Sequence, residues 1–288
     1  MSNIQFYIQL MKFRLSATVV FSALIGYLLG TNAAQLDEVA LLLIAGVLVT
    51  GSANAFNQIV ECEYDKLMKR TATRPLPTGN LSVKNAIVFA STIGILGLYI
   101  LHMINMQCSF FGLLSILLYV LIYTPLKRKS PISIFIGAFP GAIPILLGWV
   151  AATDDFGLAA GILFAIQFCW QFPHFIAISW VLDEEYKKAG FKMMIAGEKG
   201  KIPAFVAIIS ALLMTLVSVI PFLLQIEQLQ LSVYGAIVIL VLGLLFTAKS
   251  FQLLQKQTEV AARKVLVNSY LYLPLMQLIY VLDKYLMQ

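Results

Sequence analysis

Nine apolar segments, each long enough to cross a lipid bilayer, constrain this chain more than any other feature. A transmembrane helix needs about 20 mainly apolar residues to cross roughly 30 Å of hydrocarbon. Only 12% of the 288 residues are charged, whereas a soluble domain carries about 25%. We therefore expect an all-α, polytopic membrane protein that forms a single domain over residues 1–288; the fourth and eighth segments are short, so eight spans are the alternative. The expected spans are 15–30, 36–57, 84–103, 107–124, 131–152, 156–181, 202–224, 231–248 and 265–283.

The basic residues lie on one side of this predicted topology. Of the 20 Lys and Arg residues, all but Lys284 lie close to the start of the first span or around the connections that follow even-numbered spans. The positive-inside rule then places the N-terminus and these loops in the cytoplasm, with the chain integral to a bacterial cytoplasmic membrane. The basic residues of these loops account for the pI near 9.1, which we therefore interpret as a signal of orientation. We expect no nucleic-acid partner, since no basic run is interleaved with aromatic residues, and no cleavable signal peptide.

The end of the second span carries polar residues that a membrane helix does not need for folding. Asn57, Glu61 and Asp65 recur every four residues, a spacing that places them on one face of a continuing helix. Ionisable groups at the end of a membrane helix indicate a binding function. Their oxygen atoms suit Mg²⁺, which prefers one or two carboxylates together with substrate phosphate oxygens.

A second acidic connection follows the sixth span. Residues 182–201 contain Asp183 and Glu185, followed by several lysines. Both acidic connections follow even-numbered spans, so both open on the same membrane face, and the two halves of the chain look like weak repeats. Repeated membrane proteins often place a site between their halves. The alternative is that these mixed charges form solvated surface pairs.

Longer motifs turn this pattern into a family resemblance. Asn57, Glu61 and Asp65 resemble the Asn-x-x-x-Asp-x-x-x-Asp motif of the UbiA-type intramembrane prenyltransferases. The segment Trp170–Phe175 resembles the branch of that family that farnesylates haem. Further matching segments are Arg70–Gly79, Tyr123–Pro131, Gly137–Pro144 with Gly148–Trp149, Glu185–Gly190 and Asn268–Pro274.

Four positions depart from the family's pattern. Glu61 and Glu63 stand where Asp is commoner, and Glu reaches one methylene further and can still ligate Mg²⁺. Cys62 stands where Arg is usual, which removes one phosphate or propionate contact. Phe13 replaces a common Pro, and we expect no catalytic consequence from that change.

The resemblance implies a reaction and a metal. The farnesyl group of farnesyl diphosphate would be transferred to a vinyl group of haem b with hydration, giving haem O and diphosphate. The helices would surround a central cavity that holds the farnesyl tail. Two Mg²⁺ ions would act as Lewis acids on the leaving diphosphate. We expect Glu61 and Asp65 to hold one ion and Asp183 or Glu185 to hold the second, with Asn57 orienting the first.

Other residues are expected to contact the substrates. The candidates are Lys66, Arg70, Arg74, Tyr123, Lys127, Tyr186 and Arg263. A purely topological role is the alternative for the cations, and Arg263 would either neutralise a haem propionate or anchor the ninth span. For His174, inside the haem-type segment, we expect an axial haem contact or a base that assists hydration. The alternative for His174 is a hydrogen-bonded packing residue.

Two other functions compete with this hypothesis. A UbiA-type enzyme acting on an aromatic quinone precursor is disfavoured by the segments Trp170–Phe175 and Tyr123–Lys129. A membrane transporter would need polar groups near the midplane, whereas the cores of the nine segments are nearly uncharged. The resemblance also suggests a haem A-forming enzyme or oxidase assembly as a partner, besides the substrates and the lipid bilayer.

Overall fold

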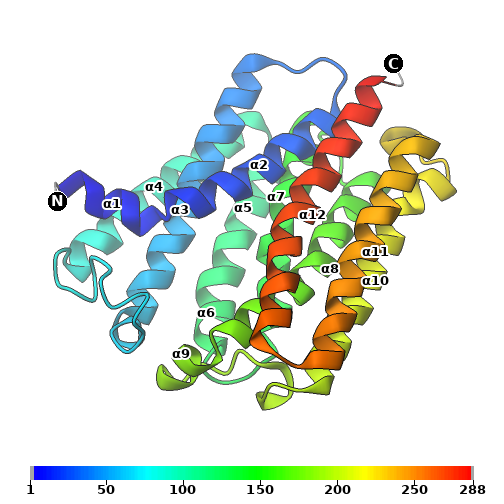
Figure 1. Cartoon of the computed structure of the whole chain (residues 1–288). Helices are drawn as coiled ribbons and strands as arrows, with labels where there is room; N and C mark the ends of the chain where they lie inside the picture. Colours follow the sequence, from blue (N-terminus) through cyan, green and yellow to red (C-terminus); the bar gives the residue numbers. More distant parts are fainter. Residues whose placement is uncertain (1–2, 287–288) are drawn as a thin grey trace.

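The computed structural model describes residues 3–286, and these form an all-helical bundle (Figure 1). Nine helices of the described part are long and apolar enough to cross a membrane, which confirms the predicted count. Eight of the spans are α2 (Phe13–Gly30), α3 (Leu36–Asp65), α4 (Val83–Ile104), α7 (Ser133–Thr153), α8 (Leu158–Val181), α10 (Lys201–Leu223), α11 (Val233–Lys256) and α12 (Glu259–Leu286). The remaining span runs from α5 (Met106–Leu117) through a π-helical turn (Leu118–Tyr123) into α6 (Thr124–Leu126). Shorter elements are α1 (Asn3–Met11), α9 (Asp183–Lys188) and 3₁₀ turns at Ile195–Gly197 and Glu227–Leu229.

One end of the bundle gathers the connections that carry most of the basic residues, and we call this end the basic face. It comprises the connections 66–82, 127–132, 182–200 and 257–258 together with the adjoining helix ends. In Figure 1, α6 and α9 lie at this end and the C-terminus lies at the opposite end. The charge separation expected from the sequence is therefore a separation between two ends of the folded bundle.

Several spans are longer than the apolar runs from which we predicted them. α3 continues to Asp65 instead of ending at residue 57, and α12 begins at Glu259 instead of residue 265. Apolar length reports the thickness of the hydrocarbon, whereas a helix can continue beyond the bilayer because its backbone bonds are internal. The extension of α3 keeps Asn57, Glu61 and Asp65 on one helix, as the spacing of four requires.

Two glycines let α2 pack directly against α7. A Cβ atom at Gly26 would collide with the carbonyl oxygen of Ile145, and one at Gly148 would collide with the carbonyl oxygen of Ala23. Without lipid between them, membrane helices approach this closely only where small residues face each other. The α2–α7 pair therefore forms a fixed wall of the bundle.

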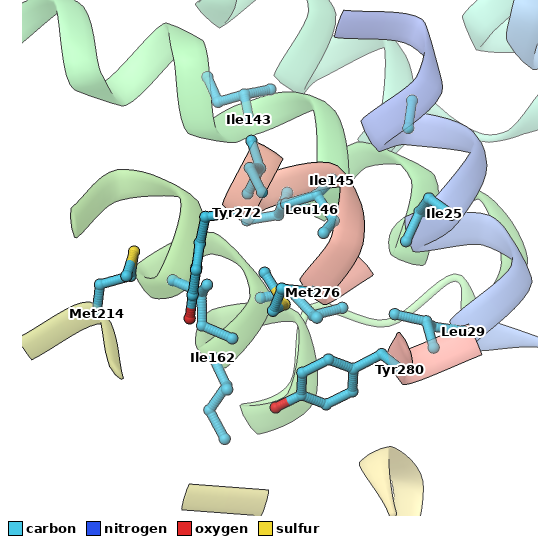
Figure 2. Packing of buried hydrophobic residues seen from close by; sticks show 14 of the residues in the cluster. Ile25, Leu29, Ile143, Ile145, Leu146, Ile162, Met214, Tyr272, Met276 and Tyr280 are labelled. Atoms are coloured by element: carbon cyan, nitrogen blue, oxygen red, sulfur yellow. The ribbon is translucent and has the colours of Figure 1, made fainter. Parts of the chain in front are cut away.

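α12 contributes side chains to the buried centre beside α2 and α8. Its Tyr272 and Tyr280 are buried, and Figure 2 shows them among aliphatic side chains from neighbouring helices. Gln277 Nε2 donates to Ser22 Oγ of α2 at 3.1 Å and to Gln167 Oε1 of α8 at 3.3 Å. Polar atoms inside a membrane protein need such internal partners, so these bonds fix α12 relative to both helices.

Candidate active site

The last turns of α3 carry three buried polar side chains on one face. Asn57, Glu61 and Asp65 are 2%, 5% and 0% exposed. Taking carboxylates out of water is costly unless opposite charges or hydrogen bonds compensate. The fold provides that compensation with cations from three segments that are far apart in the sequence.

Arg74 and Lys127 pair with the two carboxylates of α3. Arg74 Nη1 donates to Asp65 Oδ2 at 2.6 Å, and Lys127 forms an ion pair with Glu61. Burial is the largest single influence and lowers the pKa of Lys127, but the Glu61 carboxylate and the phenols of Tyr119 and Tyr186 together raise it above its ordinary value. The Lys127 ammonium also lies 5.0 Å from the ring centroid of Tyr123. The structure thus brings three of the predicted substrate-binding residues next to the predicted metal ligands.

Lys12 is a fourth polar neighbour, which the sequence analysis did not single out. It joins α1 to α2 in a left-handed conformation with φ of 50°, and its Nζ donates to Asn57 Oδ1 at 3.1 Å. Burial, followed by the charge of Arg74, lowers the pKa of Lys12 to about 7. Asn57 Nδ2 donates in turn to Thr124 Oγ1 at 3.1 Å, directly after the π-helical turn. The one signal for Lys12 in the sequence is its place before the first span, which predicts only topology.

The second acidic stretch lies on the short helix α9. Asp183 is buried and forms ion pairs with Lys187 at 2.8 Å and with Lys199 at 3.8 Å. Glu185 Oε2 is buried and has no hydrogen-bond partner among the described residues. Both carboxylates that the sequence predicts for a second metal ion therefore belong to one short element at the basic face.

Aromatic and basic side chains join the two acidic connections. Arg70 Nη2 donates to Tyr186 Oη at 3.3 Å, and the guanidinium lies 5.4 Å from the centroid of that ring. The ring centroids of Tyr64 and Phe191 are 6.1 Å apart, and the Lys127 ammonium lies 5.3 Å from that of Phe191. The structure thus brings together the two loops that the sequence analysis expects on one face.

Two of the predicted substrate contacts lie apart from this assembly. Lys66 is exposed and bonds Glu63 at 2.7 Å, three residues earlier on the same segment. Arg263 is exposed and bonds Glu259 at 2.5 Å within α12. Neither side chain contacts the buried carboxylates in this structure, so their expected roles in diphosphate and propionate binding remain predictions.

His174 lies among aromatic side chains between α8 and α12. Its ring stacks on Trp170, with centroids 4.6 Å apart and planes inclined by 19°. The ring of Tyr270 meets it edge-on at 5.2 Å, and His174 Nδ1 lies 2.7 Å from Ser269 Oγ.

The donor set at the basic face fits Mg²⁺ shared with a substrate. Among the described residues there is no group of three or more His, Cys, Asp or Glu side chains that could hold a metal alone. Asp65 Oδ1 and Glu185 Oε2 are, however, buried carboxylate oxygens with no hydrogen-bond partner within residues 3–286. Mg²⁺ typically takes one or two carboxylates and completes its octahedron with phosphate oxygens and water. The two carboxylates on α3 and the two on α9 are therefore suitable ligands for Mg²⁺ bound together with a diphosphate.

An all-helical membrane bundle with two acidic stretches joined at one face is the arrangement expected of an intramembrane prenyltransferase. Residues 19–272 match the UbiA prenyltransferase family, and the chain belongs to that family. Its relatives include the protoheme IX farnesyltransferase of Flavobacterium psychrophilum, which is 45% identical over 96% of this chain and 94% of its own length. The enzyme with the same name from Christiangramia forsetii is 46% identical over 96% of this chain and 93% of its own length.

Solved structures show the same fold at lower identity. A digeranylgeranylglyceryl phosphate synthase structure superposes with a TM-score of 0.83 at 23% identity, covering 98% of this chain and 99% of that one. A UbiA homolog from Archaeoglobus fulgidus bound to GPP and Mg²⁺ superposes with a TM-score of 0.68 at 16% identity, covering 96% and 99%. The predicted family and fold are therefore confirmed, and membership in a prenyltransferase family argues against the transporter alternative.

Proposed function

We propose that this protein transfers the farnesyl group of farnesyl diphosphate to a vinyl group of protohaem IX (haem b), with hydration, giving haem O and diphosphate. The observation that carries the proposal is the buried assembly of α3 carboxylates and cations at the basic face, in a chain 45% identical to a protoheme IX farnesyltransferase. An aromatic quinone precursor as acceptor is the alternative that the experiment below must exclude.

The chain's own cations suit the binding of a diphosphate. Arg74, Lys127 and Lys12 lie around the acidic face of α3, whereas Arg70 contacts Tyr186 across the junction to α9. Charge-assisted hydrogen bonds from such groups to phosphate oxygens are about twice as strong as neutral ones. On binding, Arg74 and Lys127 would share their donors between the carboxylates and the diphosphate, so the substrate would not have to displace the whole network.

Glu61 and Asp65 would hold one Mg²⁺, and Asp183 and Glu185 a second. Bound there, the metal supplies Lewis acidity that stabilises the charge developing on the diphosphate as the allylic C–O bond breaks. The free oxygens of Asp65 and Glu185 support this assignment. The hydrogen bonds of Asn57 to Lys12 and Thr124 hold its side chain in place beside Glu61.

The acceptor would meet the farnesyl cation close to the basic face. The aromatic side chains at the junction of α3, α6 and α9 exclude water from the reacting carbon until the acceptor captures it. Tyr123 is buried there, and the Tyr186 ring of α9 contacts Arg70 at the same junction. Water must then add to the cation on the vinyl-derived carbon and lose a proton, which completes the hydration.

The same proposal orients the protein in its membrane. The basic face would lie in the cytoplasm, as the positive-inside rule requires, and both water-soluble ends of the substrates would be reached from there. A haem A-forming enzyme or an oxidase assembly would receive the product.

The test is a direct assay of the purified protein with farnesyl diphosphate and protohaem IX, with and without Mg²⁺. We expect haem O, identified by mass, only when both substrates and the metal are present. Prenylation of an aromatic acid in parallel reactions, with protohaem IX unchanged, would overturn the proposal in favour of a quinone-precursor enzyme.

A further inference from the structure

The hydrogen bonds of Ser269 determine which nitrogen of His174 carries the proton. Ser269 Oγ lies 2.6 Å from the carbonyl oxygen of Leu266 and 2.7 Å from His174 Nδ1. A carbonyl oxygen only accepts, so the single hydroxyl proton points to Leu266. The hydroxyl oxygen then accepts a hydrogen bond from Nδ1–H, and the neutral ring has its lone pair on Nε2.

The other nitrogen of His174 is open. Nε2 makes no hydrogen bond with any described residue, and it is not among the fully buried atoms that lack a partner. It therefore keeps some accessible surface, although the residue as a whole is only 9% exposed. The ring cannot easily turn to hide this nitrogen, because Trp170 stacks on it and also donates from Nε1 to the Ser269 carbonyl at 2.9 Å.

This arrangement matches what a metal-ligating histidine requires. Such residues almost always donate the second ring N–H to an acceptor, which fixes the tautomer and increases the basicity of the ligating nitrogen. Here the acceptor is the Ser269 hydroxyl, which itself donates to the Leu266 carbonyl. Both hydrogen bonds therefore donate away from the ring, and the lone pair stays on Nε2.

We infer that Ser269 is a positioning residue that presents the Nε2 lone pair of His174 to the iron of bound protohaem IX. This inference rests on the proposed function, since it concerns the acceptor substrate. It assigns Ser269, which the sequence analysis places in a matching segment without a role, and it decides between the two chemical roles expected for His174 in favour of an iron ligand.

The test is haem binding to the full-length protein in detergent, with protohaem IX alone as the probe. Resonance Raman spectra of the wild type should contain an iron–imidazole stretching band, and His174→Ala should remove it until free imidazole is added. Ser269→Ala should keep the band but move it to lower frequency, and should raise the dissociation constant about tenfold, as loss of an outer hydrogen bond to a ligand does.

Ser179→Ala is the matched control, because Ser179 is another buried serine, on α8, whose hydroxyl has no hydrogen-bond partner in the described part of the chain. Its spectrum and affinity should equal those of the wild type. An unchanged band in His174→Ala, or an unshifted one in Ser269→Ala, overturns the inference while farnesyl transfer by the wild type leaves the proposed function standing. A wild type that neither binds nor farnesylates protohaem IX overturns both.

Discussion

The two acidic stretches of the basic face have different supports. Asn57, Glu61 and Asp65 lie on the continuous helix α3, and the cations that contact them come from distant segments of the chain. Asp183 and Glu185 lie on the six-residue helix α9, and Asp183 pairs with two lysines that remain partly exposed. A site on a long packed helix is held more precisely than one on a connection. The first stretch is therefore the fixed half of the site and the second is the adjustable half.

The largest effect should follow from changing the fixed half. Asp65→Asn removes the charge of a fully buried carboxylate whose Oδ1 is free to bind a metal. We expect kcat for farnesyl transfer to fall at least about 1,000-fold, which corresponds to roughly 4 kcal/mol in activation free energy. Glu63→Gln is the matched control, since Glu63 is exposed on the same helix and pairs with Lys66. Equal losses of kcat in Asp65→Asn and Glu63→Gln would contradict a specific role of Asp65 in the reaction.

A smaller effect should follow from the adjustable half. Glu185→Gln replaces a carboxylate that has a buried, unpartnered oxygen, and we expect kcat/KM to fall roughly 100-fold. The Mg²⁺ concentration for half-maximal activity should rise at the same time. Glu184→Gln, at the exposed neighbouring position, should change neither quantity. If Mg²⁺ dependence stays the same in Glu185→Gln, this carboxylate holds no metal.

The charge of Lys12 should make substrate affinity depend on pH. Its ammonium faces Arg74, Glu61, Lys127 and Asp65, and its pKa is lowered to about 7. The group is charged below that pH and neutral above it, so KM for farnesyl diphosphate should rise about tenfold between roughly pH 6 and 8. Lys12→Arg, which stays charged, should show a weaker rise over the same range. Identical pH profiles of the two proteins would show that Lys12 does not bind the diphosphate.

The smallest effect should come from the contact between the halves. Arg70→Gln removes the guanidinium from the Tyr186 ring and its hydrogen bond to the phenol. Cation–π pairs at exposed positions are weak, so we expect kcat/KM to fall only about two- to fivefold. Limited proteolysis within residues 182–200 should become faster in this variant. Unchanged proteolysis would mean that other contacts hold α9 in place.

The sequence predicted the parts of this molecule that depend on local pattern. Apolar runs gave the nine spans, because the bilayer imposes one length on every segment that crosses it. The spacing of Asn57, Glu61 and Asp65 predicted their common face, because helix geometry alone determines it. The pairing of the two acidic loops followed from counting spans, which fixes the membrane side of each connection.

The contacts around those residues could not be predicted in this way. Lys12 meets Asn57 and Lys127 meets Glu61 only after α2, α3 and α6 have packed together. The tautomer of His174 depends on Ser269, which lies 95 positions later in the chain. No local sequence pattern encodes such pairs. A lysine before a span, such as Lys12, has the same hydropathy whether it contacts solvent or a buried amide.

The glycine contact between α2 and α7 limits how a long isoprenoid can reach the interior from the bilayer. At Gly26 and Gly148 the two helices touch through backbone atoms, so no side chain stands there that could rotate aside. A rotamer change opens a passage at little cost, whereas moving a helical carbonyl disrupts hydrogen bonding that hydrocarbon cannot replace. Rotation of a side chain consequently cannot open this seam, and we expect a long amphiphile to enter between other pairs of helices.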